Sequence, residues 1–553
     1  MSVASFAQIP VDVDRNAREQ LLRQERERAL REEQEQRPDV RLNPPKLDAG
    51  GVIPDEVPCF PIDRIRLSGE GAEGFGWALS SASEPGDLAT GRCLGAQGIN
   101  VVMSRIQNAI VKRGFVTTRV LAGDQDLKRR ELVLTIVPGR LSQIRFDGTE
   151  LPVSAENAIP LASGDLLQLR AIEQGLENFK RVPTVDADIQ IVPATGSQAL
   201  AGESDLLVSW KQARKFRLSL TADDAGSRAT GKNQGAATLS LDNPLTLSDL
   251  FYVSYNHALA PLNSDGRSTD GYSVHYSLPI GFWTLSSNFS DSNYSQTVAG
   301  ASQAYVYSGK SQNAEIKLGR ILLRNATSKT SAAMRGWSRA ASSFVDDTEI
   351  LVQKRRTAGW GAELNHRAFL GKSTLDMTFD YRRGTGAMAS LEAPEESLGQ
   401  GTSRMELMGF NAQLDIPFSV AEQKLRYMGS WRQQWNRTPL TSQDRLSIGN
   451  RYTVRGFDGE LTLMGERGFV SRNEFALSLG ALASESYWAL DYGRVMGFPT
   501  ADQLGRSLLG TAIGLRGALK GVSYDVFVGA PVDKPSHFKT AGVTAGFNLA
   551  WSY

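Results

Sequence analysis

Residues 543–553 decide the fold, and they read VTAGFNLAWSY. Their larger apolar side chains recur at every second position, so they share one face of an extended strand. These residues are Val543, Ala545, Phe547, Leu549, Trp551 and Tyr553. An unpaired strand with so apolar a face invites aggregation. Pairing with the first strand of the same sheet removes that edge, so the segment predicts the last strand of a closed barrel.

The same period-two pattern runs back along the chain to about residue 213. Apolar residues alternate with polar or charged ones in residues 216–221, 272–278 and 375–382. This alternation is typical of strands with lipid on one side and water on the other. Between Lys215 and Tyr553 there are about sixteen candidate strands, an even number of the size that porins use. A mostly β fold is predicted, with a 16-stranded antiparallel transmembrane barrel over residues 213–553.

A soluble β-sandwich is the alternative, because its strands also alternate. The strands here are long, their polar faces carry full charges, and aromatic residues recur near their ends, which favours the barrel. No apolar run approaches the roughly 18–20 residues of a spanning helix. Lys and Arg number 61 against 60 Asp and Glu, so no global field favours nucleic acid as a partner.

A long connection at about residues 436–467 contains the segment NRYTVRGFDGE, residues 450–460. Arg455 stands between Val454 and Gly456, with Phe457 next, which is an unusual choice for a solvated loop tip. Arginine pairs bidentately with carboxylates, so we expect Arg455 to anchor a loop folded back into the lumen. Its natural partner is Asp491, on the strand at residues 487–492. An exposed surface loop is the alternative.

Two α+β modules precede the barrel, expected at residues 58–140 and 141–212. The first has strand-like residues 62–67, a helix at 100–112 and β-rich segments at 115–121 and 131–137. The second repeats this order with strands at 141–146, 186–192 and 204–210 around a helix at 166–181. Neither module has room for an enzyme cleft.

The first 36 residues are expected to hold one polar helix, from about Asp14 to Gln36. Charges of both signs lie at helical-neighbour spacing, and the broad apolar stripe of a permanently docked helix is missing. Two alternatives are open: a solvated helix or coiled-coil fragment, and a helix that rests in a water-filled lumen. A proline-marked linker over residues 37–57 follows it. No signal-peptide pattern opens the chain, and Ser5, Phe6 and Ala7 are interpreted as the remnant of a cleavage site.

The only cysteines, Cys59 and Cys93, both fall in the first module. In an oxidising periplasm they are expected to form a disulfide that stabilises the module by roughly 3 kcal/mol, although a free buried pair is the alternative. The four histidines lack ligand spacing, so neither a metal nor another cofactor is predicted. No local signature supports a Ser/His/acid hydrolase, and the chain is not expected to be an enzyme.

The chain resembles the two-partner-secretion transporters of the haemolysin, filamentous-haemagglutinin and contact-dependent-inhibition type. The most specific match is Val454-Arg455-Gly456-Phe457, which is similar to the tip of that family's pore-inserted loop. Asp491 and Gly493, within WALDYG, match the strand motif whose acidic residue locks the arginine. Residues 114–120, 125–127, 472–474 and 529–535 also resemble family segments, and the cysteine pair matches one branch.

The resemblance implies a monomeric outer-membrane barrel with two POTRA (polypeptide-transport-associated) domains in the periplasm. The N-terminal helix and the inserted loop would plug the barrel at rest. Its partner would be a secreted TpsA-type exoprotein, a haemolysin, adhesin or toxin that folds into a β-helix outside the cell. Lipid bilayer and lipopolysaccharide would surround the barrel, and the barrel-assembly machinery would insert it.

Partner recognition by strand addition to a POTRA sheet edge is expected. Candidate residues are Ile172, Leu176 and Phe179 on the second module's helix, which could instead pack its core. A general outer-membrane assembly factor of the same superfamily is the main functional alternative. A passive porin and an outer-membrane hydrolase are further ones, and a porin would lack the soluble front end.

Overall fold

The computed structural model describes residues 13–35, 38–42, 44–45, 51–148, 153–195, 200–259, 267–300, 302–480 and 483–553, with side chains from residue 19 onward. The interpretation of Ser5, Phe6 and Ala7 as a cleavage remnant falls outside the described residues. Residues 37, 43 and 46–50 of the linker also fall outside them. No helix within these ranges is both long and apolar enough to cross a membrane.

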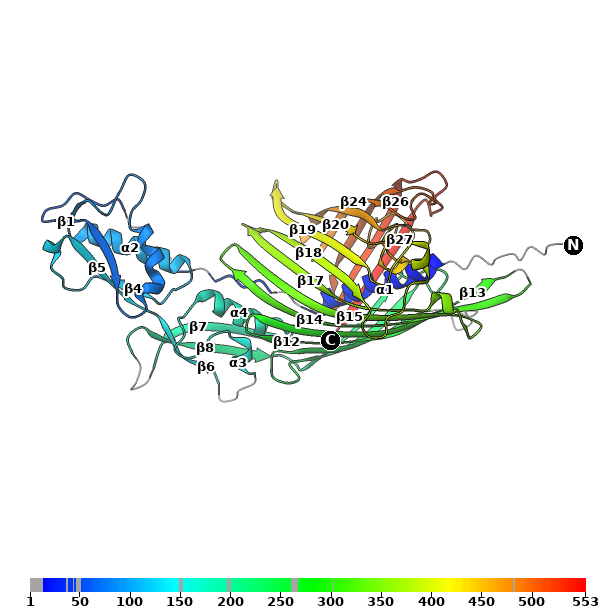
Figure 1. Ribbon diagram of the computed structural model, residues 1–553, viewed down its shortest axis with the longest axis horizontal. Coiled ribbons are helices and arrows are strands. Elements are labelled where there is room, and N and C mark those ends of the chain that lie inside the picture. The colour runs from blue at the N-terminus through cyan, green and yellow to red at the C-terminus, as the bar shows by residue number, and fades with distance from the viewer. Residues whose placement is uncertain are drawn as a thin grey trace.

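Sixteen antiparallel strands form a closed barrel, as predicted (Figure 1). The strands are β9 (Phe216–Asp223), β10 (Gln234–Asp242), β11 (Leu250–Ala258), β12 (Ser268–Ile280), β13 (Trp283–Ala299), β14 (Ala304–Arg324), β15 (Ser328–Val345), β17 (Arg355–Leu370), β18 (Ser373–Thr385), β19 (Glu406–Val420), β20 (Gln423–Asn436), β23 (Arg467–Ser478), β24 (Ser484–Met496), β25 (Ser507–Leu519), β26 (Val522–Asp533) and β27 (Thr544–Ser552). The two-residue β16 (Thr348–Glu349) pairs antiparallel with the end of β15 and is not counted as a barrel strand.

The barrel closes between its last strand and its first. In register, β27 pairs with β9 from Asn548 opposite Asp223 to Ser552 opposite Ser219. Beyond that ladder, the Tyr553 N–H donates to the Leu218 carbonyl at 2.9 Å. The C-terminal segment therefore has a main-chain partner along its length, which is the closure that its alternation predicts.

The outer wall of the barrel is apolar. Ile316, Trp488 and Ile513 are 62%, 47% and 62% exposed, whereas Glu474 and Asp491, on neighbouring strands, are buried. A sandwich would place its apolar faces inside, between two sheets. The alternation therefore reflects lipid outside and a polar lumen inside, and the sandwich alternative is excluded.

The first POTRA domain packs a three-stranded sheet, in the order β2-β5-β4, against helix α2. Its elements are β1 (Phe60–Ile62), β2 (Arg64–Ser68), the 3-10 helix η1 (Ala72–Ser81), β3 (Arg92–Leu94), α2 (Ala96–Lys112), β4 (Arg119–Leu121), η2 (Leu127–Arg129) and β5 (Glu131–Val137). A disulfide joins Cys59 to Cys93, next to the paired β1 and β3. Helix α2 begins four residues before the predicted start, where Glu56 accepts the N–H groups of Gln97 and Gly98.

The second POTRA domain repeats this plan with the sheet order β6-β8-β7. Its elements are β6 (Arg140–Phe146), α3 (Ala155–Ala158), α4 (Leu169–Lys180), β7 (Val185–Pro193) and β8 (Glu203–Gln212). This domain lies against the barrel, and the first domain extends away from it (Figure 1). Asn178 and Asn157 donate to the Gly281 and Leu247 carbonyls in barrel turns at 2.8 and 2.6 Å. Both carbonyls belong to turns in the first half of the barrel.

Helix α1 (Val13–Gln34) lies inside the ring of strands (Figure 1). The sequence left a solvated helix and a lumenal helix open, and the structure has the lumenal one. Its polar character fits this position, because the lumen wall supplies polar and charged partners on several sides.

Candidate functional site: the inserted loop, the plug helix and the lumen wall

The connection between β20 and β23 folds back into the barrel. Two short paired strands, β21 (Leu446–Ile448) and β22 (Leu463–Gly465), form its stem, after the 3-10 helix η5 (Ser442–Asp444). Val454 is fully buried and Phe457 nearly so, in a cluster with Ile448 and barrel residues Leu508 and Phe538. The predicted loop bounds match the observed ones, and the exposed-loop alternative is wrong.

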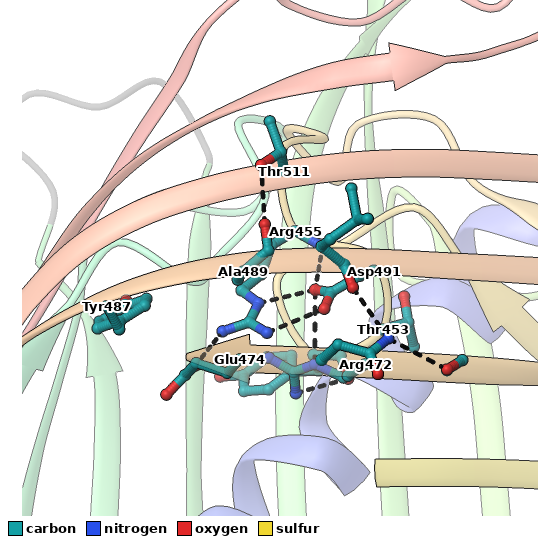
Figure 2. A network of polar contacts seen from close by, with 12 residues as sticks. Thr453, Arg455, Arg472, Glu474, Tyr487, Ala489, Asp491 and Thr511 are labelled. Carbon is teal, nitrogen blue, oxygen red and sulfur yellow. Dashed lines mark hydrogen bonds and ion pairs between the residues drawn. The ribbon is translucent and has the colours of Figure 1, made fainter. Parts of the chain in front are cut away.

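Arg455, at the tip of this loop, meets Asp491 of β24 through three donors (Figure 2). Its backbone N–H, Nε and Nη2 donate to the Asp491 carboxylate at 3.0, 2.7 and 2.9 Å. Asp491 is fully buried. The side-chain pair has the bidentate geometry that gives arginine–carboxylate contacts their strength and direction.

A second carboxylate extends the network. Arg455 Nη1 donates to Glu474 of β23, and Glu474 also accepts from Arg516 of β25 at 2.6 Å. Arg472, opposite Asp491 in the β23–β24 register, lies 3.6 Å from that carboxylate. The sequence analysis did not identify Glu474 or Arg516 as site residues. Glu474 lies in the segment 472–474 that resembles the family, but its lumen-facing alternation, like that of Arg516, is shared by many other charged residues.

Glycines on the facing strands make room for the loop backbone. A Cβ on Gly510 would lie 2.0 Å from the Arg455 carbonyl oxygen, and one on Gly493 would lie 2.9 Å from Val454 Cγ2. Gly456 has a φ of 96° and packs against the Ala530 carbonyl, a conformation that other residues rarely adopt. The loop tip therefore lies in main-chain contact with the wall, and Gly493 is a packing position.

The middle of α1 binds the wall through its basic residues. Arg23 Nη1 donates to Ser292 Oγ at 2.5 Å, and its Nη2 donates to the Asn293 carbonyl at 3.2 Å. Arg26 donates to Gln234 at 3.3 Å. These contacts fall on β10 and β13.

Contacts with other strands lie beside these residues and at the last turn of the same helix. Glu25 accepts from Arg432 Nη1 of β20 at 2.5 Å, across the lumen from β10 and β13. At the last turn, Gln34 accepts from Arg217 and Ser240 at 3.1 and 2.9 Å. Basic and acidic side chains of the helix therefore bind strands on opposite sides of the lumen.

A cavity of about 950 Å³ opens beside the C-terminal turn of α1. Its lining is polar and includes Glu32, Asp376 and Asp415 together with Arg455 and Arg516 of the loop network. Water filling this space can therefore reach the network directly.

The proposed recognition residues on the second POTRA domain do not form a surface. Ile172 and Phe179 are fully buried and Leu176 is 2% exposed, all within the core of that domain. They form the apolar stripe by which α4 packs on its own sheet, so the structure has the core-packing alternative that the sequence left open. Among the residues described, no cluster of His, Cys, Asp and Glu could hold a metal ion.

A closed lipid-facing barrel with two periplasmic POTRA domains and an inserted arginine loop defines a polypeptide-transporting outer-membrane protein. The comparisons with known proteins specify the family. The haemolysin secretion/activation protein ShlB/FhaC/HecB model matches residues 202–517, and two POTRA models match residues 60–139 and 140–193. The chain belongs to this family of outer-membrane transporters of two-partner secretion. It is a family of transporters.

Individual relatives agree over nearly the full length. Outer membrane transporter CdiB-2 of Burkholderia pseudomallei is 36% identical, over 93% of this chain and 90% of that protein. Outer membrane transporter CdiB of Dickeya dadantii is 27% identical, over 90% and 87%. The solved structure of CdiB from Acinetobacter baumannii is 30% identical, with a TM-score of 0.84 and 98% and 99% coverage.

Proposed function

We propose that this chain exports one large TpsA-type partner protein, of the contact-dependent growth-inhibition class, and that its loop network locks the resting pore. The names of the CdiB relatives support this class of partner over a haemolysin or an adhesin. The carrying observation is that α1 and the loop tip both occupy the lumen and are bound to its wall. A chain can pass only when at least one of them moves.

The energy for export is proposed to come from binding and from folding of the partner outside the cell. Recognition would use an extended segment of the partner added to a POTRA surface other than the buried apolar stripe of α4. A monomeric barrel is expected to suffice, in contact with bilayer and lipopolysaccharide and inserted by the barrel-assembly machinery.

Co-expression with a candidate TpsA-type partner, such as the product of a large adjacent gene, tests the export function. The partner should reach the medium only when this chain is present. The alternative, a general assembly factor, instead predicts that other outer-membrane proteins decline when the chain is deleted while partner export depends on it only indirectly. Measuring both in the same cells separates the two functions.

Planar-bilayer recording tests the plug. Deletion of residues 14–36 should convert a mostly closed channel into a wide, steady one. Unchanged conductance after the deletion would contradict the proposed resting seal.

A further inference from the structure

The linker segment between α1 and the first POTRA domain is bound to the second POTRA domain. The Val40 N–H donates to Glu177 Oε1 at 3.0 Å, and the Leu42 N–H donates to Glu173 Oε1 at 2.8 Å. The Val40 carbonyl accepts from Arg324 Nη2, at the end of β14, at 2.6 Å. Two alternate amides and one carbonyl of the linker are therefore paired, as they would be at a sheet edge.

Helix α4 can imitate a strand edge because of its spacing. Glu173 and Glu177 are four residues apart, so their positions differ by about 6 Å along the helix axis. Alternate amides of an extended chain are about 6.6 Å apart and point to the same side. Since Val40 pairs with Glu177 and Leu42 with Glu173, the linker runs antiparallel to α4.

Side chains of residues 38–42 contact the second POTRA domain on one side and the barrel on the other, so this linker segment lies in a slot between the two. Val40 and Leu42 pack against the core of the second POTRA domain. Asp39 forms an ion pair with Arg367 of β17 at 2.6 Å, and the Arg41 guanidinium lies 4.4 Å from the centre of the Phe369 ring. The apolar side chains thus face the POTRA domain, and the charged ones face the barrel.

The Glu177 acceptor on α4 is held in its charged form. Burial favours the neutral carboxyl of Glu177, but hydrogen bonds and charge from Arg324 and Lys329 outweigh it and lower the pKa of that group. Arg324 also donates to Glu173 at 3.1 Å. An ionised carboxylate is an acceptor only, so this surface selects main-chain N–H groups.

The bound linker restrains the plug. Gln34, the last residue of α1, is four residues from Pro38, and four extended residues span at most about 14 Å. A helix of 22 residues is about 33 Å long and must move by a similar distance to leave the lumen. Withdrawal of α1 toward the periplasm therefore requires residues 38–42 to leave the slot.

We propose that the slot between α4 and the periplasmic ends of β14 and β17 is a docking site for an extended segment of the secreted partner. Residues 38–42 are its resting occupant. The partner segment carries apolar side chains two residues apart and free N–H groups at those positions, and it replaces the linker. This inference rests on the proposed function for the identity of the partner, whereas the slot itself is testable without one.

Proline substitution tests the hydrogen bonds of the occupant. Val40→Pro with Leu42→Pro deletes both donors, and each bond to a carboxylate shifts an equilibrium by about tenfold. In planar bilayers the double variant of the full chain should stay open at least about tenfold longer than wild type. Arg41→Pro, compared with Arg41→Ala, is the control, because both variants lose the Arg41 contact with Phe369 and only the first stiffens the segment, while the amide of residue 41 lies between the two donors. Equal opening by the control, or a closed double variant, would overturn the proposal.

A peptide tests whether the slot accepts an occupant from outside. The peptide RPDVRLNPP, residues 37–45 of this chain, should open the wild-type channel when added on the POTRA side. The same peptide N-methylated at the residues equivalent to Val40 and Leu42 lacks both donors and should be inactive. Equal effects of the two peptides, or none from either, would refute a main-chain docking site.

Crosslinking in cells addresses the partner itself. A photoreactive residue in place of Leu42 should crosslink to the second POTRA domain at rest and lose that crosslink while the partner is exported. A crosslink that persists during active export would overturn displacement by the partner. If the partner is never exported, the proposed function fails, whereas the bilayer results for the slot stand on their own.

Discussion

Arg455 and Asp491 are joined through the backbone as well as the side chain of the arginine, at 3.0 Å from the backbone N–H and 2.7 Å from Nε (Figure 2). The backbone hydrogen bond fixes the position of the loop main chain, and the side-chain hydrogen bonds fix the orientation of the Arg455 guanidinium. A lock of this kind is sensitive both to the charge of the aspartate and to the distance between loop and wall. These two properties can be changed separately.

Asp491→Asn changes charge with little change in shape. It leaves the buried guanidinium with Glu474 as its principal carboxylate, and removing one member of a buried ion pair typically costs about 3–5 kcal/mol. We expect the loop to leave the wall and partner export to fall, while the barrel remains assembled. Heat-modifiable mobility on gels measures assembly, and partner in the medium measures export.

Arg455→Lys is the companion variant. It keeps the positive charge but has no planar fork, so it should impair export nearly as much as Asp491→Asn. Wild-type export by both variants would show that the pair does not control transport.

Gly510→Ala changes distance without changing charge. Its Cβ would lie 2.0 Å from the Arg455 carbonyl oxygen, so the loop tip must move. Gly336→Ala on β15 is the matched control, because its Cβ would meet nothing within 4 Å. We expect protease cleavage within the loop for the first variant only. Equal protection of the two loops would argue against close packing there.

The sequence predicted the barrel, its closure and the loop partner because each depends on a local pattern. Alternation in residues 543–553 reports an apolar outer face directly, and Arg455 stood out against the composition of its loop. The polar face of α4 could not be read in this way. Glu173 and Glu177 look like solvated helix residues, and only tertiary contact with Arg324 and the linker buries them. Ile172, Leu176 and Phe179 show the same limit, because an apolar stripe on a helix fits a binding surface and a domain core equally well until the fold is known.

The first POTRA domain should show an acid-sensitive helix end at α2. The Gly98 N–H, with those of Gln97 and Gly95, lowers the pKa of the Glu56 carboxyl below its ordinary value of 4.5, against a smaller effect of burial. A lowered pKa stabilises the folded state at pH values above the ordinary pKa of the group. This stabilisation is lost as the pH falls through the pKa of the folded state. Hydrogen exchange at the first turn of α2 should be faster in Glu56→Gln than in wild type at pH 6, and equal at pH 2. A difference that persists in acid would exclude this charge as its source.

Loss of the disulfide should weaken the same domain alone. Cys59 and Cys93 are separated by 34 residues, and a loop of that size is restrained by about 3–4 kcal/mol in the unfolded chain. Cys59→Ser with Cys93→Ser should lower the urea concentration at the unfolding midpoint of the first POTRA domain. Hydrogen exchange of that domain measures this midpoint. Exchange in the barrel strands is the internal control and should not change.

The plug helix offers a charge-exchange test. Glu25 and Arg432 join α1 to β20 at 2.5 Å, and Arg28 lies 3.8 Å from the same carboxylate. Arg432→Glu places two carboxylates together and should raise the open time of the channel, since a hydrogen-bonded charge pair contributes about 1.5–3 kcal/mol. Glu25→Arg alone should act in the same direction. The double exchange restores opposite charges and keeps Arg28 close to a carboxylate, now on the wall, so it should return most of the closed state. If the open time of the double variant equals the sum of the effects of the two single variants, the Glu25–Arg432 pair does not hold α1. The contacts of Arg23 and Gln34 must then hold the helix in the lumen.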